Sequence, residues 1–148
     1  MYPSLKPSQR EAIMGVIAPQ SATTVKSTAW VDASTFQNFL ATVSVGAMTS
    51  TGTVDAKIQQ ATDSSGTGVK DITGKAVTQF VAGTNDNQQA LINVKQDELD
   101  VNGGFGFIRL SNTPATAASL IAGHLRGVDA RYGPADGLAA ASQAQIVG

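Results

Sequence analysis

Residues 54–74 read VDAKIQQATDSSGTGVKDITG and combine a strand-like alternation with a loop rich in Asp, Ser and Gly. Val54, Ala56 and Ile58 alternate with polar residues, which predicts a strand with one face in a core. The loop at 63–68 contains two glycines, which adopt positive φ without steric cost. The apolar pattern resumes at 69–72, so the stretch predicts a β-hairpin.

The same loop has two features of ligand-binding loops. Asp63, Ser65 and Thr67 stand at alternate positions, as in a calcium loop, but the closing position holds Gly74 where a bidentate glutamate is required. A phosphate-binding loop requires glycines that lead into a helix, whereas Gly68 leads into a strand pattern. We therefore expect a turn that binds neither a metal nor a phosphate.

Alternation of apolar and polar residues extends over residues 21–127, with turn-forming residues between the runs. This pattern predicts seven or eight short strands and an all-β sandwich or barrel. A strand–helix–strand rhythm is missing, which argues against a parallel α/β sheet. Besides the hairpin, the predicted strands lie at residues 25–31, 39–45, 77–81, 90–94, 105–110 and 117–126.

The two ends of the chain differ from this central region. Residues 1–20 contain three of the five prolines, which predicts an extended arm; a frayed terminus is the alternative. Residues 128–148 are rich in Gly and Ala and predict a tail. We expect neither end to bury much apolar surface in its own domain, so their apolar residues are candidate interface residues: Tyr2, Leu5, Ile13, Met14, Tyr132, Leu138 and Ile146.

Composition excludes several classes of function. The 148 residues suit a single domain, they include no cysteine, and only 14% are charged. The net charge of −1 and the scattered Lys and Arg residues lack the basic patch of a nucleic-acid-binding protein. No run of 18 apolar residues predicts a membrane helix, and no signal peptide is evident. We expect a protein that is made or assembled in the cytoplasm.

Three further groups of residues are candidate sites. His124, the only histidine, has no catalytic-triad or zinc partners in the sequence pattern and is interpreted as structural; a trimer axis that unites three copies is the alternative. Asp97, Glu98 and Asp100 predict a solvated acidic loop more readily than a cation site or an acid–base pair. Trp30, Phe105 and Phe107 predict core packing more readily than a carbohydrate-stacking platform. We predict no catalytic, cofactor or metal residues.

Three segments carry a family resemblance: AKIQQATDSSGTGVKDITGKAVTQF (56–80), FGFIRLSNTPA (105–115) and HLRGVDARYGPAD (124–136). Together they resemble small virion structural proteins of tailed bacteriophages, over about residues 36–134. The chain departs from that pattern in its glycine-rich residues 102–106 and its long C-terminal tail.

The pattern of residues predicts a β-sandwich over residues 21–127 between the arm (1–20) and the tail (128–148), and the resemblance implies that this sandwich is jelly-roll-like. The resemblance also implies a non-enzymatic capsid decoration or cement protein. The expected partners are the major capsid protein and further copies of the chain, as a trimer, on the surface of a virion assembled in the host cytoplasm. A tail, neck or fibre component is one alternative, and a carbohydrate-binding module is another.

Overall fold

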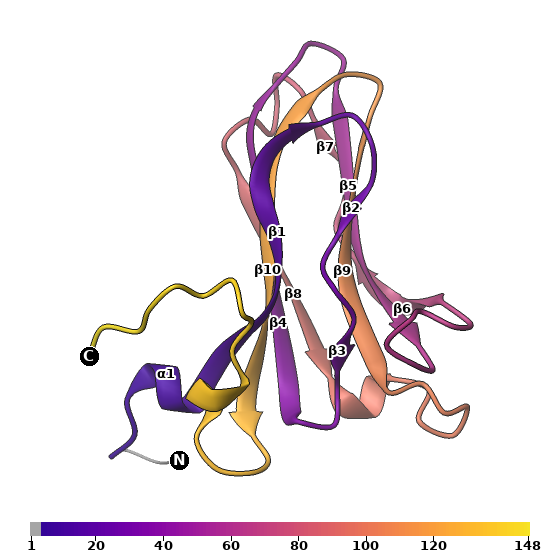
Figure 1. Cartoon of the computed structure of the whole chain (residues 1–148). Coiled ribbons are helices and arrows are strands. Elements are labelled where there is room, and N and C mark those ends of the chain that lie inside the picture. The colour runs from indigo at the N-terminus through magenta and orange to yellow at the C-terminus, as the bar shows by residue number, and fades with distance from the viewer. Residues whose placement is uncertain (1–3) are drawn as a thin grey trace.

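The computed structural model describes residues 4–148 and consists of two antiparallel β-sheets that pack face to face (Figure 1). Strands account for 52% of the residues and helices for 8%, so the predicted all-β sandwich is confirmed. Three short helical turns lie outside the sheets: α1 (Pro7–Arg10), η1 (Gln96–Glu98) and η2 (Ala135–Leu138).

The first of the two sheets is named sheet A, and the second is named sheet B. The strands of sheet A, in spatial order, are β1 (Glu11–Ala22), β10 (Ser119–Ala130), β4 (Phe36–Met48) and β8 (Gln89–Lys95). Sheet B has the order β2 (Lys26–Ser27), β9 (Phe107–Ala115), β5 (Thr53–Ala61) and β6 (Lys70–Ala76). Two short strands complete sheet B: β3 (Val31–Asp32) pairs with β9, and β7 (Phe80–Val81) pairs with β5.

The strand order is that of a jelly roll. β2 with β3, and β6 with β7, each act as one interrupted strand, which leaves four strand positions in each sheet. The chain crosses between the sheets at most connections, so the first strand lies beside the last one in sheet A. Double four-stranded sheets with such crossings define the jelly roll, and the jelly-roll-like topology is confirmed.

Alternation along each strand builds the core between the two sheets. Phe36, Ile58, Leu110 and Leu125 are fully buried, and the Phe36 and Phe39 rings meet edge to face with their centroids 6.1 Å apart. A Cβ on Gly127 of β10 would overlap the ring of Phe36. The close contact between β10 and this ring therefore requires glycine at that position.

The predicted boundaries of the arm and the tail are wrong. Residues 11–20, assigned to the arm, belong to β1, which pairs with β10 along its whole length. Two β-bulges in β1 shift the phase of its apolar residues, so the sequence does not display a regular period of two there. At the other end β10 continues to Ala130, three residues beyond the predicted limit of the domain.

Two predicted strands are shorter than expected. Residues 25–31 form only the two-residue segments β2 and β3, and residues 77–81 contribute only β7. Among residues 4–148, no helix is long and apolar enough to cross a membrane.

Candidate functional site: an uncharged docking face on sheet A

The loop at residues 62–69 is a hairpin turn between β5 and β6. Asp63 Oδ1 accepts hydrogen bonds from the backbone N–H groups of Ser65 (2.8 Å) and Thr67 (3.1 Å). A hydrogen bond from the Thr67 side chain, together with these backbone bonds, holds the pKa of Asp63 below its ordinary value. Gly66 and Gly68 have φ of 85° and 68°, as a left-handed turn requires. The Asp63 carboxylate thus organises the turn by accepting from backbone N–H groups of the loop, and the predicted hairpin is confirmed.

The outer face of sheet B carries a chain of internal polar contacts. The Arg109 guanidinium donates two hydrogen bonds to Gln59 Oε1, at 3.0 and 2.9 Å. Gln59 Nε2 donates to Asp71 at 3.0 Å, and Lys57 pairs with the same carboxylate at 2.8 Å. Hydrogen bonds from Lys57 and Gln59 lower the pKa of Asp71. The network joins β9, β5 and β6, so these polar groups already bind one another.

The prediction that Trp30, Phe105 and Phe107 pack in the core is wrong, because all three are only half-buried. The Arg109 guanidinium lies 4.5 Å from the centroid of the Trp30 ring, and Lys70 Nζ lies 4.0 Å from that of Phe105. Cations over aromatic faces are favourable. One face of each of these two rings is thus covered by a cation of the same chain. Trp30 also lies against Gly66 of the β5–β6 loop, and Phe105 lies near Gly68.

The acidic residues at 97–100 form an exposed turn, as expected. Glu98 pairs with Lys75 at 2.9 Å, and Asp100 pairs with Lys70 at 2.6 Å. Hydrogen bonds from these lysines lower the pKa of both carboxyl groups. Glu98 and Asp100 therefore each have their own cation, and Asp97 is exposed. Within residues 4–148, no group of three or more His, Asp or Glu side chains is arranged to hold a metal ion.

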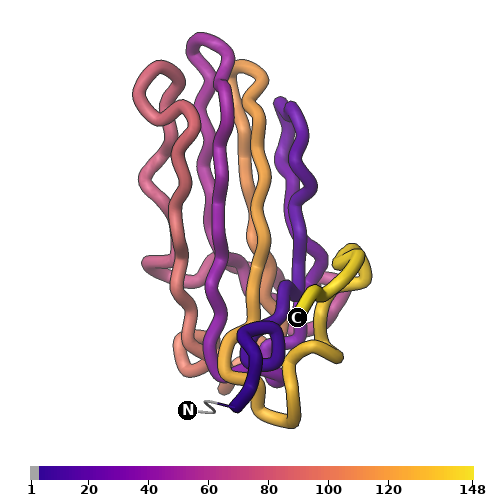
Figure 2. The backbone as a smooth tube through the Cα atoms, turned by 90° about the vertical axis from the view of Figure 1, so that its left-hand side faces the viewer, coloured from indigo at the N-terminus to yellow at the C-terminus, as the bar shows by residue number. Residues whose placement is uncertain are grey.

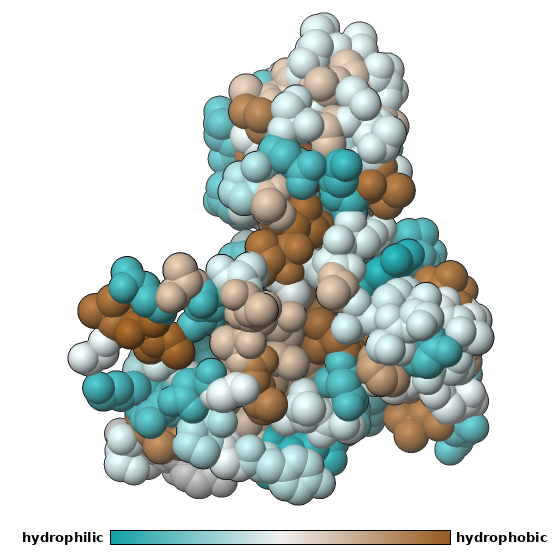
Figure 3. Space-filling view, viewed as in Figure 1, coloured by the Kyte–Doolittle hydropathy of each residue, from teal (hydrophilic) through white to brown (hydrophobic). Residues whose placement is uncertain are grey.

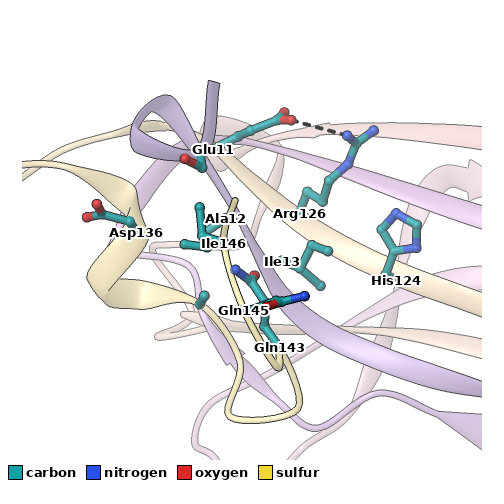
Figure 4. Close-up of a pocket in the computed structure, with 11 residues that line it drawn as sticks. Glu11, Ala12, Ile13, His124, Arg126, Asp136, Gln143, Gln145 and Ile146 are labelled. Carbon is teal, nitrogen blue, oxygen red and sulfur yellow. Dashed lines mark hydrogen bonds and ion pairs between the residues drawn. The ribbon is translucent and has the colours of Figure 1, made fainter. Parts of the chain in front are cut away.

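His124 lines a pocket of about 380 Å³ on the outer side of sheet A, together with side chains of β1 and of the C-terminal segment (Figure 4). Arg126, two residues along β10, pairs with Glu11 of β1 at 3.3 Å, the contact drawn dashed in Figure 4. Burial and the nearby Arg126 charge lower the pKa of His124, and Glu11 opposes this shift. The ring is therefore held in its neutral form near pH 7.

The C-terminal segment covers the lower part of this face (Figure 2). The Ala140 N–H donates to the Ile13 carbonyl at 2.7 Å, Ala135 is fully buried, and Leu138 packs against the core. The expectation that the tail buries little apolar surface in its own domain is wrong for this part. The segment folds back because β1, which was not expected, presents both a free edge and apolar side chains.

The structure brings only some of the predicted interface residues together. Ile13 and Ile146 line the same pocket, and Met14 and Leu138 pack against the core. Leu5 is half-buried, and Tyr132 is 80% exposed. Tyr2 lies outside the described residues. Further along the C-terminal segment, Ile146 and Val147 are 46% and 86% exposed. Apolar side chains gather on this segment at the left of Figure 3.

Above the segment, sheet A presents a broad outer face that the pattern of no single strand predicts (Figure 2). β4 contains no charged residue, and the charged residues of the other three strands, Glu11, Arg126, Asp129 and Lys95, lie toward the α1 end by the strand register. From the row of His124 upward the outer face is uncharged. We call this region the docking face; it comprises Val16, Ala18, Thr42, Ser44, Gln89, Leu91, Leu120, Ala122 and His124.

Large apolar side chains are exposed on the docking face. Val16, Leu91 and Leu120 are 39%, 60% and 46% exposed, and they come from three different strands. A groove of about 500 Å³ crosses the upper end of the face, and none of its lining residues is charged. Only the register of strands that are far apart in the sequence brings these residues together, so periodicity within single strands did not reveal the face.

No protein-family model and no curated protein sequence matches this chain.

Proposed function

We propose that the protein is a non-enzymatic virion structural protein of a tailed bacteriophage, which binds the capsid lattice as a decoration or cement protein. The observation that carries this proposal is the exposed and uncharged docking face of sheet A. The centres of protein interfaces are depleted of charged residues, because removing a charge from water costs free energy. Because the docking face carries no charge, a partner can cover it without the free-energy cost of burying a charge. Burial of its exposed apolar side chains then adds favourable free energy.

The outer faces of the two sheets differ in a way that supports an orientation with sheet A toward the capsid and sheet B toward the solvent. The polar groups on sheet B are engaged in the Arg109–Gln59–Asp71 network, which suits a surface that faces water. Sheet A then faces the lattice, and the resemblance to phage virion proteins supports the major capsid protein as the partner. The proposal places the protein on the virion surface, after assembly in the host cytoplasm.

A binding experiment with particles tests this proposal. Capsids of the phage that encodes the chain are prepared without the protein, mixed with the purified protein, sedimented and heated. We expect saturable binding and a higher temperature of capsid rupture. Binding to isolated tails or fibres in place of capsids would support the tail-component alternative and overturn the proposal. Hits on a glycan array without capsid binding would overturn it in favour of a carbohydrate-binding module.

A further inference from the structure

The edge of sheet A formed by β8 differs from the other sheet edges. Sheet edges carry unpaired N–H and C=O groups, and natural proteins protect them with bulges, prolines, charges or short strands. β1 has two bulges and Pro19, and the C-terminal segment bonds to it at Ile13. In sheet B, β2, β3 and β7 have two residues each, and β6 carries Lys70, Asp71 and Lys75.

β8 has none of these forms of protection over residues 89–94. Its sequence QALINVK contains no proline and only one charge, at its last residue. Its pairing with β4 runs through seven successive residues without a register shift. Among the described residues, β8 pairs only with β4, so its other edge has no strand partner, although residues 74–80 of sheet B lie close to it.

The backbone groups that face the open side can be assigned. The Gln88 carbonyl accepts from Val45 N–H of β4, and the direction of these groups alternates along a strand. The N–H and C=O groups of Gln89, Leu91 and Asn93 therefore point away from β4. Lys95 N–H also points away, but it donates to Glu98 Oε2 at 2.8 Å, which ends the available edge.

We propose that β8 pairs antiparallel with β8 of a second copy of this chain, about a twofold axis at Leu91. Three residues with free backbone groups are symmetric about Leu91, so Leu91 lies opposite Leu91 of the second copy and Gln89 lies opposite Asn93. All three residues then form ladder hydrogen bonds. This interface needs no capsid, and its test is independent of the proposed function.

The side chains in this register suit a pair of identical strands. Leu91 is 60% exposed on the docking face, and the pairing places two such leucines side by side. No like charges lie directly opposite each other among residues 89–93, since none of these residues is charged. A groove of about 560 Å³ beside β8, lined by residues 74–80 and 90–93, borders the edge to which the new strand is added.

The pairing has a structural consequence. The two sheets A become one continuous eight-stranded sheet, so two docking faces join into one surface. A twofold pair also differs from the trimer expected for a protein on an icosahedral lattice, and the mass of the oligomer distinguishes the two.

Cysteine cross-linking of the full-length protein tests both the interface and the register, because the natural chain has no cysteine. Leu91→Cys should cross-link to a dimer under mild oxidation, since directly opposite residues have Cα atoms about 5.5 Å apart. Gln89→Cys and Asn93→Cys should not cross-link alone, because each would lie opposite the other type of residue. The double variant Gln89→Cys/Asn93→Cys should cross-link.

Sedimentation equilibrium gives the second test. The wild-type chain should approach twice 15.1 kDa as its concentration rises. Leu91→Lys should weaken association about tenfold through like charges placed opposite each other. Leu120→Lys, a similar change on an inner strand of the same face, should leave it unaltered. Circular dichroism verifies that each variant folds. A monomer or trimer at all concentrations, or equal cross-linking of Leu91→Cys and Gln89→Cys, would overturn the proposal.

Discussion

Ala140 donates its backbone N–H to the carbonyl of Ile13 at 2.7 Å, and this bond attaches the C-terminal segment to the first strand of the sandwich. Ala135 and Leu138 add apolar contacts to the same junction. The segment is therefore part of the folded domain up to at least Ala140.

Replacement of Leu138 by Ala should lower the stability of the domain. The side chain is partly buried against the core, so we expect a loss of about 1–2 kcal/mol in the free energy of unfolding. Val147→Ala is the control, because Val147 is 86% exposed and its replacement should change stability by less than about 0.5 kcal/mol. Urea denaturation measures both. Equal stability of the two variants would mean that the segment contributes nothing to the fold.

Gly66 should tolerate alanine less well than Gly74 does. Both glycines have positive φ, of 85° and 77°, which costs an alanine about 1–2 kcal/mol. At Gly74 nothing lies within 4 Å of the new Cβ, whereas at Gly66 the Cβ would lie 2.6 Å from Trp30 Nε1. Gly66→Ala should therefore lose more stability and also shift the fluorescence of the only tryptophan. An unshifted Trp30 emission in a folded Gly66→Ala variant would contradict the packing of Trp30 on the loop.

Stability should fall as the pH drops from 7.5 to 5.5. The pKa of His124 is lower in the folded chain than the ordinary value of 6.5, so the unfolded chain binds the proton more readily in this range. The stability that depends on neutral His124 is complete above about pH 6.5 and is lost as the pH falls through the lowered pKa. The carboxyl groups with lowered pKa values have ordinary values of 3.8–4.5, so their effects begin at lower pH.

His124→Gln provides the control for this pH dependence. The urea midpoint of the variant should vary less between pH 5.5 and 7.5 than that of the wild type. Capsid binding at pH 7.5 should be largely retained, since His124 lies at the lower limit of the docking face. An unchanged pH profile would show that the histidine does not sense the environment of the pocket.

Regular alternation allowed much of the sandwich to be predicted from the sequence. Val54, Ala56 and Ile58 alternate without interruption, and all three are buried as expected. β1 escaped prediction because its bulges shift the apolar phase and Pro19 suggested an arm. Trp30 and Phe105 were assigned to the core because their hydrophobicity does not reveal the Arg109 and Lys70 cations that hold them at the surface.

The docking face could not be predicted from any single segment, because its residues come from strands that are far apart in the sequence. Val16, Leu91 and Leu120 come to lie on one face through the register of β1, β10, β4 and β8. The sequence predicts a candidate interface in the terminal segments, where Met14 and Leu138 instead pack against the core of the same chain.

The affinity of two matched variants for capsids tests the central claim most directly. Leu120 lies on the docking face and Val69 in the β5–β6 hairpin loop, and their exposed fractions are 46% and 45%. Leu120→Asp would require a charge to be buried in the interface, so we expect at least a tenfold loss of affinity for capsids that lack the protein. Val69→Asp should bind like the wild type, and circular dichroism should show that both variants are folded. Wild-type affinity of a folded Leu120→Asp variant would contradict the assignment of sheet A as the surface that binds the capsid.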